Sequence, residues 1–194
     1  MHALGVIAAN YNELEGHFYQ LFYATMGKMD VGKLVFSKLN NAERMEIALK
    51  LSETDPSPTF RELFEYFISG YGVATENRNI LMHSKAHNAW PFDISVVHLT
   101  LAKPSKKSPD ENNFINLDLS ELRTVADDMA NFAMFGWSLF YWRSAVPFGG
   151  TITWASGEKV TPSLPEKPAE PRRLVLSPQE APAGTPPSQL SSGE

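Results

Sequence analysis

The side chains best suited to chemistry lie in one short stretch, where Arg78 and Asn79 are followed by His83. An arginine is a permanent cation, and its planar fork of donors fits phosphate oxygens. A histidine titrates near pH ~6.5 and can therefore accept or donate a proton at neutral pH. Arg78 and His83 together suggest phosphodiester cleavage, with Asn79 orienting one of them through a hydrogen bond.

A purely structural role for the same motif is an open alternative. Arg78 can pair with a carboxylate such as Glu13, Glu15 or Glu76. His83 can instead cap the C-terminus of a helix, where a cation is favoured. Arginine and histidine are common at helix ends.

A metal site is a weaker interpretation of the histidines. His83 and His87 are four residues apart, which is the spacing of two zinc ligands on one helix face. A third ligand is missing nearby, no glutamate follows His83 directly, and Pro91 indicates that the helix frays. We therefore expect neither a metal nor a cofactor. His87 is interpreted as a solvent-facing loop residue and His98 as a strand residue with a local partner.

Composition limits the class of protein. The chain has 194 residues, 43% hydrophobic residues, a net charge of −5 and no cysteine. This is typical of one soluble domain, excludes disulfides and thiolate metal sites, and indicates no broad face for nucleic acid. Polar residues from Asn10 onward argue against a signal peptide, and the apolar run 132–142 is shorter than the roughly 20 residues of a membrane span. We expect a cytoplasmic protein that does not bind membranes.

Apolar residues at steps of three and four predict the first helices. One helix runs from Leu4 to Thr25 and ends at Gly27, and a short helix follows Asp30, which can cap it. Asn40 and Asn41 then start another helical stretch.

A long third helix should carry the Arg78 motif. Ser57 is suited to accept the free amides at its start, with Pro58 at the first helical position. The apolar stripe of this helix continues to Arg78, which predicts a core-facing arginine. Gly70 and Gly72 each weaken the helix by up to ~1 kcal/mol relative to alanine, so we expect a kink there.

Strand signals follow the long helix. Residues 94–101 are rich in β-branched side chains, and residues 114–117 are a shorter apolar partner, so a β-hairpin is expected at about 94–117. Lys103, Lys106 and Lys107 are the one compact basic group, interpreted as part of a solvated loop in preference to an RNA contact. Asp118 and Glu121 predict the capping box of a final helix that ends near Arg143.

The end of the chain changes character. The final helix contains an aromatic cluster, interpreted as core or dimer interface in preference to a platform for stacked bases: Phe132, Phe135, Trp137, Phe140, Tyr141 and Trp142. Residues 146–194 are rich in proline and poor in large apolar residues, which predicts a disordered tail. An adaptor function through this tail is a further alternative, in which deletion of residues 147–194 abolishes capture of a partner.

The motif and the helical pattern resemble the HEPN family of RNA-processing domains. The signature of that family is an arginine, usually followed by a polar residue, with a histidine four to six residues away; Arg78, Asn79 and His83 match it. Residues 11–15 and 22–24 also resemble the openings of bacterial members. The resemblance covers roughly residues 3–143. It implies a mainly α fold, a four-to-five-helix up-down bundle in a domain of residues 1–145, with the hairpin as an insertion.

What the resemblance implies about function is a metal-independent endoribonuclease of toxin or phage-defence type. Its members join two motifs in a composite site at a homodimer interface, so RNA and a second copy are the expected partners. The alternative is a catalytically inactive HEPN-like module that binds a protein or a nucleotide, with an antitoxin or a nucleotidyltransferase as partner.

Overall fold

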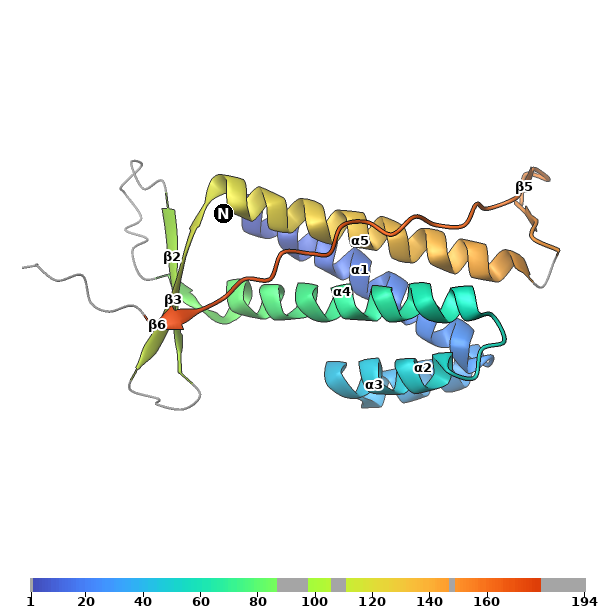
Figure 1. Ribbon diagram of the computed structural model, residues 1–194, viewed down its shortest axis with the longest axis horizontal. Helices are drawn as coiled ribbons and strands as arrows, with labels where there is room; N and C mark the ends of the chain where they lie inside the picture. The colour runs from blue at the N-terminus through green and yellow to red at the C-terminus, as the bar shows by residue number, and fades with distance from the viewer. Residues whose placement is uncertain (1, 87–97, 106–110, 147–148, 179–194) are drawn as a thin grey trace, which may run out of the picture.

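The computed structural model describes residues 2–86, 98–105, 111–146 and 149–178 (Figure 1). The chain is mainly helical with a small antiparallel sheet. The helices are α1 (His2–Met26), α2 (Met29–Lys38), α3 (Asn41–Ser52), α4 (Pro58–His83) and α5 (Leu119–Ala145). The strands are β1 (Lys85–Ala86), β2 (His98–Pro104), β3 (Asn112–Asp118), β4 (Ile152–Thr153), β5 (Lys159–Val160) and β6 (Ser177–Pro178).

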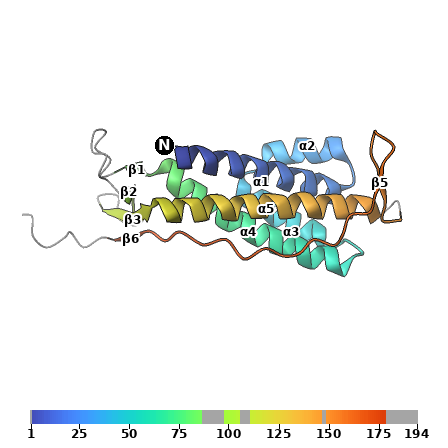
Figure 2. The ribbon, with the colours of Figure 1, turned by 90° about the horizontal axis from the view of Figure 1, so that it is seen from above.

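The three long helices α1, α4 and α5 lie side by side, with α2 and α3 beside one end and the sheet at the other (Figures 1 and 2). The Asn10 amide donates to the carbonyl of Ala126, and the Cβ of His17 lies close to Gly136, so α1 and α5 run in the same direction. The helix α4 runs in the opposite direction. Its C-terminal end, which carries the Arg78 motif, therefore lies at the sheet.

Local capping sets where three helices begin. Asn40 and Glu43 form a capping box at α3, and Asp118 and Glu121 form another at α5. Ser57 accepts a hydrogen bond from the amide of Phe60 at the start of α4. These starts agree with the sequence. The prediction for α2 was wrong in one detail, because Asp30 lies inside its first turn and the N-cap residue is Lys28.

Two glycines set the approach of α4 to α5. A β-carbon on Gly70 would lie 1.9 Å from Cε1 of Phe132, and one on Gly136 would lie 2.5 Å from Cε2 of Phe67. On each helix, a glycine thus packs against a phenylalanine of the other helix. We expected a kink at Gly70, but α4 is continuous from Pro58 to His83, and the missing side chain of Gly70 allows close packing.

The core is built mainly from apolar and aromatic side chains of the three long helices. It also includes Phe36 of α2, Ala48 of α3, Leu101 of β2, Leu117 of β3 and Leu174 near the end of the described chain. Phe132 and Phe135 of the predicted aromatic cluster belong to this core. Trp137 and Tyr141 lie on the outer side of α5, where the Tyr141 ring contacts both the Trp137 ring and the ring of Trp154 in the β4–β5 hairpin. The cluster is therefore split between the core and an outer aromatic row.

The predicted hairpin is confirmed in β2 and β3, which pair antiparallel with Leu101 opposite Ile115. Residues 94–97, which we also expected to be extended, lie outside the described residues. Two short strands join the hairpin, so that the sheet has the order β1-β2-β3-β6. The strand β1 comes two residues after the end of α4, and β6 comes from the C-terminal part of the chain.

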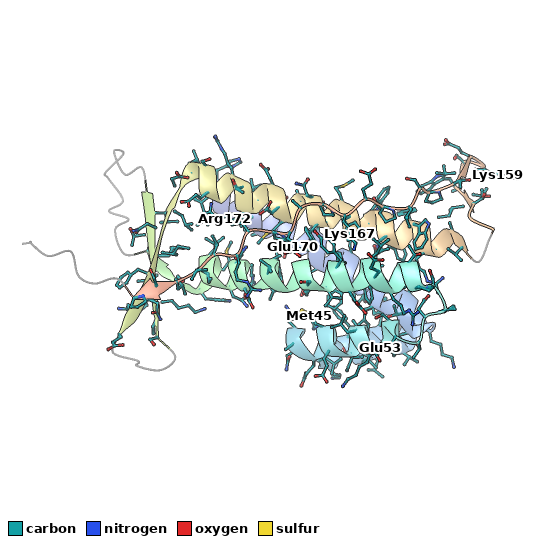
Figure 3. All side chains as sticks on the ribbon, viewed as in Figure 1. Met45, Glu53, Lys159, Lys167, Glu170 and Arg172 are labelled. Atoms are coloured by element: carbon teal, nitrogen blue, oxygen red, sulfur yellow. The ribbon has the colours of Figure 1, made fainter. Side chains whose placement is uncertain are left out.

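Residues 163–178, here called the strap, differ from the predicted disordered tail. The strap runs in an extended form along α4 and α5, from the β4–β5 hairpin to the sheet (Figures 1 and 3). Its side chains Pro171 and Leu174 are buried, and three of its basic residues pair with carboxylates of the two helices. The sequence suggested too little apolar surface to order this segment, whereas ion pairs and main-chain hydrogen bonds hold it. Residues 179–194 lie outside the described part of the chain.

Within the described residues, no helix has both the length and the apolar character that a membrane crossing requires. The cytoplasmic location stays a prediction.

Candidate functional site

The three residues singled out from the sequence lie together at the C-terminal end of α4. Nη1 of Arg78 donates to Oδ1 of Asn79 at 3.2 Å and lies 3.2 Å from Nε2 of His83. The contact across five residues needs the length of the arginine side chain, because positions five apart are not neighbours on a helix surface. Asn79 and Arg78 are partly buried, while His83 is exposed. The motif thus forms one connected group that solvent reaches through His83.

The direction of the contact between Arg78 and His83 follows from the chemistry of the guanidinium. A guanidinium carries donors and no acceptor. Nε2 of His83 therefore accepts the hydrogen bond from Nη1 of Arg78, which leaves the ring proton on Nδ1. In this arrangement the lone pair of Nε2 is directed at the guanidinium.

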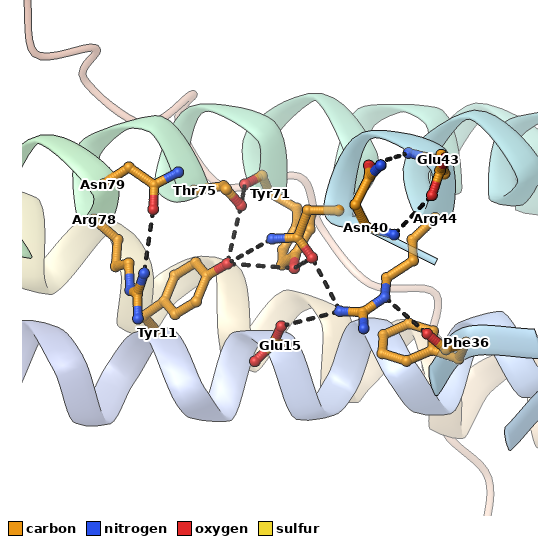
Figure 4. A network of polar contacts seen from close by, with 11 residues as sticks. Tyr11, Glu15, Phe36, Asn40, Glu43, Arg44, Tyr71, Thr75, Arg78 and Asn79 are labelled. Carbon is orange, nitrogen blue, oxygen red and sulfur yellow. Dashed lines mark hydrogen bonds and ion pairs between the residues drawn. The ribbon is translucent and has the colours of Figure 1, made fainter. Parts of the chain in front are cut away.

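The Arg78 guanidinium lies over the ring of Tyr11 in α1. The guanidinium carbon of Arg78 lies 5.6 Å from the centroid of the Tyr11 ring, within the range of a cation–π contact. Tyr11 is only 5% exposed. Its hydroxyl lies 3.1 Å from Oγ1 of Thr75 and accepts a hydrogen bond from the Asn41 amide (Figure 4). The aromatic surface under Arg78 is thereby fixed by three helices.

Tyr71 extends this network into the core. Its ring stacks on Tyr11 with centroids 6.1 Å apart, and its hydroxyl donates to Oδ1 of Asn41. Burial, followed by the proximity of Tyr11, raises the pKa of Tyr71 far above its usual range. The neutral phenol is therefore the form that the fold accepts, and it serves as a donor inside the network.

The network continues to Arg44 of α3. Arg44 donates to the Phe36 carbonyl and to Oδ1 of Asn41, and it pairs with Glu15 at 3.5 Å (Figure 4). A pocket of about 380 Å³ opens beside it, lined by Asn12, Glu15, Gly16, Tyr19, Phe36 and Arg44. These contacts join α1, α2 and α3 around Arg44.

The geometry bears on the structural alternative for Arg78. Glu15 pairs with Arg44, and Glu76 pairs with Arg173 of the strap. Among the residues that the structure describes, no carboxylate oxygen lies within 4.0 Å of the Arg78 guanidinium. Two of the three carboxylates proposed as its partners are thus paired with other arginines.

One expectation about the motif needs correction. Arg78 was predicted to face the core, but it is only partly buried, because its guanidinium rests on Tyr11 and points toward His83. In the structural alternative, Glu15 and Glu76 were possible partners, and both pair with other arginines. The apolar stripe correctly placed the backbone of position 78, but it could not show where a long side chain ends.

Two residues of the site region were missed by sequence reasoning. Asn77 is 1% exposed and binds the main chain of the strap, and Tyr11 lies under Arg78. A signal existed for Asn77, which occupies a position of the apolar stripe between Ala74 and Leu81. For Tyr11, the spacing indicated burial but gave no partner.

The other residues that we considered from the sequence either lie apart from the Arg78 motif or fall outside the described residues. His87, Lys106 and Lys107 are outside the described residues. Lys103 lies in β2, opposite Asn113 of β3. Over the described ranges, no group of three or more His, Asp or Glu side chains is arranged to hold a metal ion.

A second pocket of about 540 Å³ lies between α5 and the strap. Its lining combines apolar and polar side chains: Asn131, Met134, Phe135, Ser138, Ser163, Leu164, Pro165, Glu166, Lys167 and Pro168. It contains none of the residues of the Arg78 motif.

Comparison of the chain with models of protein families, with curated proteins and with solved structures gives no match.

Proposed function

We propose that the chain is a HEPN-like, metal-independent endoribonuclease whose active site is formed by Arg78, Asn79 and His83. The observation that carries the proposal is the single cluster in which the Arg78 guanidinium contacts both Asn79 and an exposed His83. A fixed cation beside an imidazole supplies the charge stabilisation and one of the two proton transfers that RNA cleavage without a metal requires.

The proposed reaction is an internal transesterification. Nε2 of His83 takes the proton of a ribose 2′-hydroxyl, and the 2′-oxygen attacks the adjacent phosphorus. The bond from phosphorus to the 5′-oxygen breaks, and the 5′-oxygen receives a proton from a general acid. The products are a 2′,3′-cyclic phosphate and a 5′-hydroxyl. Arg78 stabilises the negative charge of the pentacoordinate phosphate.

The contact between Arg78 and His83 suggests how substrate would engage the site. A phosphate oxygen is a stronger acceptor for a guanidinium than a neutral imidazole, because the bond is then charge-assisted. A bound phosphate would draw Nη1 of Arg78 away from His83, and the lone pair on Nε2 would become free to accept a proton. Asn79 accepts from Arg78 and so limits the positions that the guanidinium can adopt.

A second copy supplies the missing acid in this proposal. One His83 provides one proton transfer at a time, while the reaction needs a base and an acid. A two-fold axis near the C-terminal end of α4 would bring a second His83 and a second Arg78 to the same phosphate, because such an axis repeats one surface patch. The bundle of α1, α4 and α5 would then be a HEPN-like up-down bundle that presents this end of α4.

The test is cleavage of a labelled single-stranded RNA in excess EDTA. Wild type is compared with His83→Ala and with His2→Ala, a matched control that removes an exposed histidine outside the cluster. We expect cutting by wild type and the control, products with a cyclic phosphate end, and loss of cutting in His83→Ala with unchanged folding and oligomeric state. Equal cutting by all three proteins would reveal a contaminating nuclease and remove the proposal.

A catalytically inactive HEPN-like binding module is the second candidate. The observation that favours it is an exposed apolar surface formed by Met134 and Trp137 of α5, which are 60% and 38% exposed, and by Leu164 of the neighbouring strap, which is 51% exposed. Clusters of this kind mark surfaces for protein partners. This candidate predicts a folded wild-type protein that leaves RNA intact and loses a partner on Trp137→Ala. His83→Ala would leave that binding unchanged.

A further inference from the structure

The strap is attached to α4 by one buried side chain. The amide nitrogen of Asn77 donates to the carbonyl of Arg172 at 2.7 Å, and its Oδ1 accepts from the amide of Leu174 at 2.8 Å. Both polar atoms of this side chain thus form hydrogen bonds with the main chain of the strap. They replace the bonds that the main chain of a neighbouring β-strand would make. At 1% exposure, Asn77 has no access to water as a substitute partner.

Further contacts hold the same part of the strap. Leu174 is 5% exposed and belongs to the hydrophobic core. The amide of Arg172 donates to Asp128, and its side chain pairs with Glu121, both on α5 (Figure 3 labels Arg172). Arg173 pairs with Glu76 of α4. The strap is therefore fixed to both helices beside Asn77.

The strap then reaches the sheet. Ser177 lies opposite Phe114, and Pro178 lies opposite Asn113, so that β6 is the edge strand next to β3. The other edge strand is β1, whose residues Lys85 and Ala86 pair with β2. The strand β1 begins two residues after His83.

These contacts connect several segments into a closed ring, and the turn that carries the candidate site is one part of that ring. The ring passes from Asn77 through the strap to β6, across β3 and β2 to β1, and back along the chain through His83 to α4 (Figure 1). Arg78, Asn79 and His83 lie on the segment of α4 that completes the ring. Without the strap, this turn would keep the burial of Leu81 and the Tyr11 ring beside Arg78, but the sheet would lose its β6 edge and Asn77 would lose both of its hydrogen-bond partners.

We propose that Asn77 is a positioning residue for the Arg78 site, and that the strap, through Asn77, holds Arg78 and His83 at contact distance. Asn77 touches no reacting atom and acts through the adjacent Arg78. This inference rests on the proposed ribonuclease function for its catalytic consequence. Its structural consequence, the order of the last turn of α4, can be measured without any RNA.

Three full-length variants test the inference. Asn77→Ala removes both bonds from the side of α4, and Leu174→Ala loosens the same contact from the strap, leaving the sequence of α4 intact. Glu62→Gln is the control, because it removes an exposed strap ion pair with Lys167 that lies far from Asn77 along α4. If Asn77→Ala fails to fold, Leu174→Ala carries the test alone.

Three readouts are needed. Limited proteolysis reports whether the strap has detached from the helices. Amide hydrogen exchange at residues 80–84 and the NMR signals of the His83 ring report the order of the turn. We expect exchange to accelerate at least about ten-fold in Asn77→Ala and Leu174→Ala, with shifted His83 signals, and to stay unchanged in Glu62→Gln. We also expect kcat for RNA cleavage to fall about ten-fold in the first two variants with little change in KM, because binding of RNA persists and geometry is lost.

The outcomes separate the two proposals. A strap that becomes accessible to protease while exchange at residues 80–84 and the His83 signals stay as in wild type would overturn the positioning role. A strap that stays protected in both variants would overturn Asn77 as its attachment. Faster exchange and shifted His83 signals in a protein whose wild type cuts no RNA would support the positioning role and remove the nuclease.

Discussion

Gly70 and Phe132 approach each other so closely that the edge of the phenylalanine ring occupies the place of the missing side chain. A β-carbon at position 70 would lie 1.9 Å from Cε1 and 2.5 Å from Cδ1 of Phe132. Phe132 is fully buried. The distance between α4 and α5 thus depends on a glycine that helix propensity alone would disfavour.

Gly70→Ala is expected to lower the free energy of unfolding by about 1–3 kcal/mol, the usual cost of overpacking, despite the better helix propensity of alanine. Gly72→Ala is the matched control two residues away, where the added β-carbon would meet only Sδ of Met45 at 3.6 Å. There we expect a gain of up to ~1 kcal/mol. Urea unfolding of both variants measures the difference. Equal stability of the two would contradict the packing argument.

Arg78→Lys should behave almost as Arg78→Ala in RNA cleavage. The guanidinium contacts Asn79, His83 and the Tyr11 ring at once, whereas an ammonium is a compact point charge. We expect kcat/KM to fall at least about ten-fold for the lysine variant, which corresponds to ~1.4 kcal/mol of lost transition-state stabilisation. Arg123→Lys, an exposed position of α5, serves as control. If Arg78→Lys retained the wild-type rate, the positive charge alone would account for the role of Arg78, and the shape of the guanidinium would not matter.

Asp55 should be important for stability although it lies in a loop. Its Oδ2 accepts from both Nε and Nη2 of Arg143, at 3.1 and 2.7 Å, and its Oδ1 accepts from the amide of Ser57. The Asp55 side chain is 8% exposed. Asp55→Ala should lower the free energy of unfolding by about 1.5–3 kcal/mol. The substitution removes the charged hydrogen bonds and leaves Arg143 without this carboxylate partner.

Asp55→Asn is the informative comparison for that position. The asparagine amide keeps an acceptor oxygen and loses the charge. Asp55→Asn should therefore lower the free energy of unfolding less than Asp55→Ala does. Thermal unfolding of the two variants gives the order. If alanine proved as stable as wild type, the connection from the start of α4 to the end of α5 would contribute nothing measurable.

Stability should decline in alkali in a way that depends on Tyr71. Burial raises the folded-state pKa of this phenol, whereas in the unfolded chain it titrates near pH ~10. The unfolded state therefore releases the proton first as pH rises, and the free energy of unfolding falls above pH ~10. Below that pH the contribution is fully present.

Tyr71→Phe tests this dependence because the ring is kept and the ionisable group is removed. The variant should show a shallower loss of stability between pH ~10 and pH ~12 than wild type, by the equivalent of one proton. The measurement is urea unfolding at several pH values. Identical slopes would mean that another group is responsible for the alkaline loss.

The sequence by itself determined the helices and the identity of the motif. Residues such as Asn40, Ser57 and Asp118 act on amides only three residues away, so their capping roles are local and can be read from spacing. The apolar stripes predicted the buried faces for the same reason. The hairpin of β2 and β3 was also accessible, because its strands are neighbours in the chain.

The tertiary structure decided what depends on residues far apart. The contact of Arg78 with Tyr11, the closeness of Gly70 to Phe132 and the attachment of the strap at Asn77 join positions more than 60 residues apart. No spacing rule reaches over such distances. The strap shows the limit most clearly, because its composition predicted disorder. Its order comes from carboxylates and a buried amide that only the folded helices place along its path.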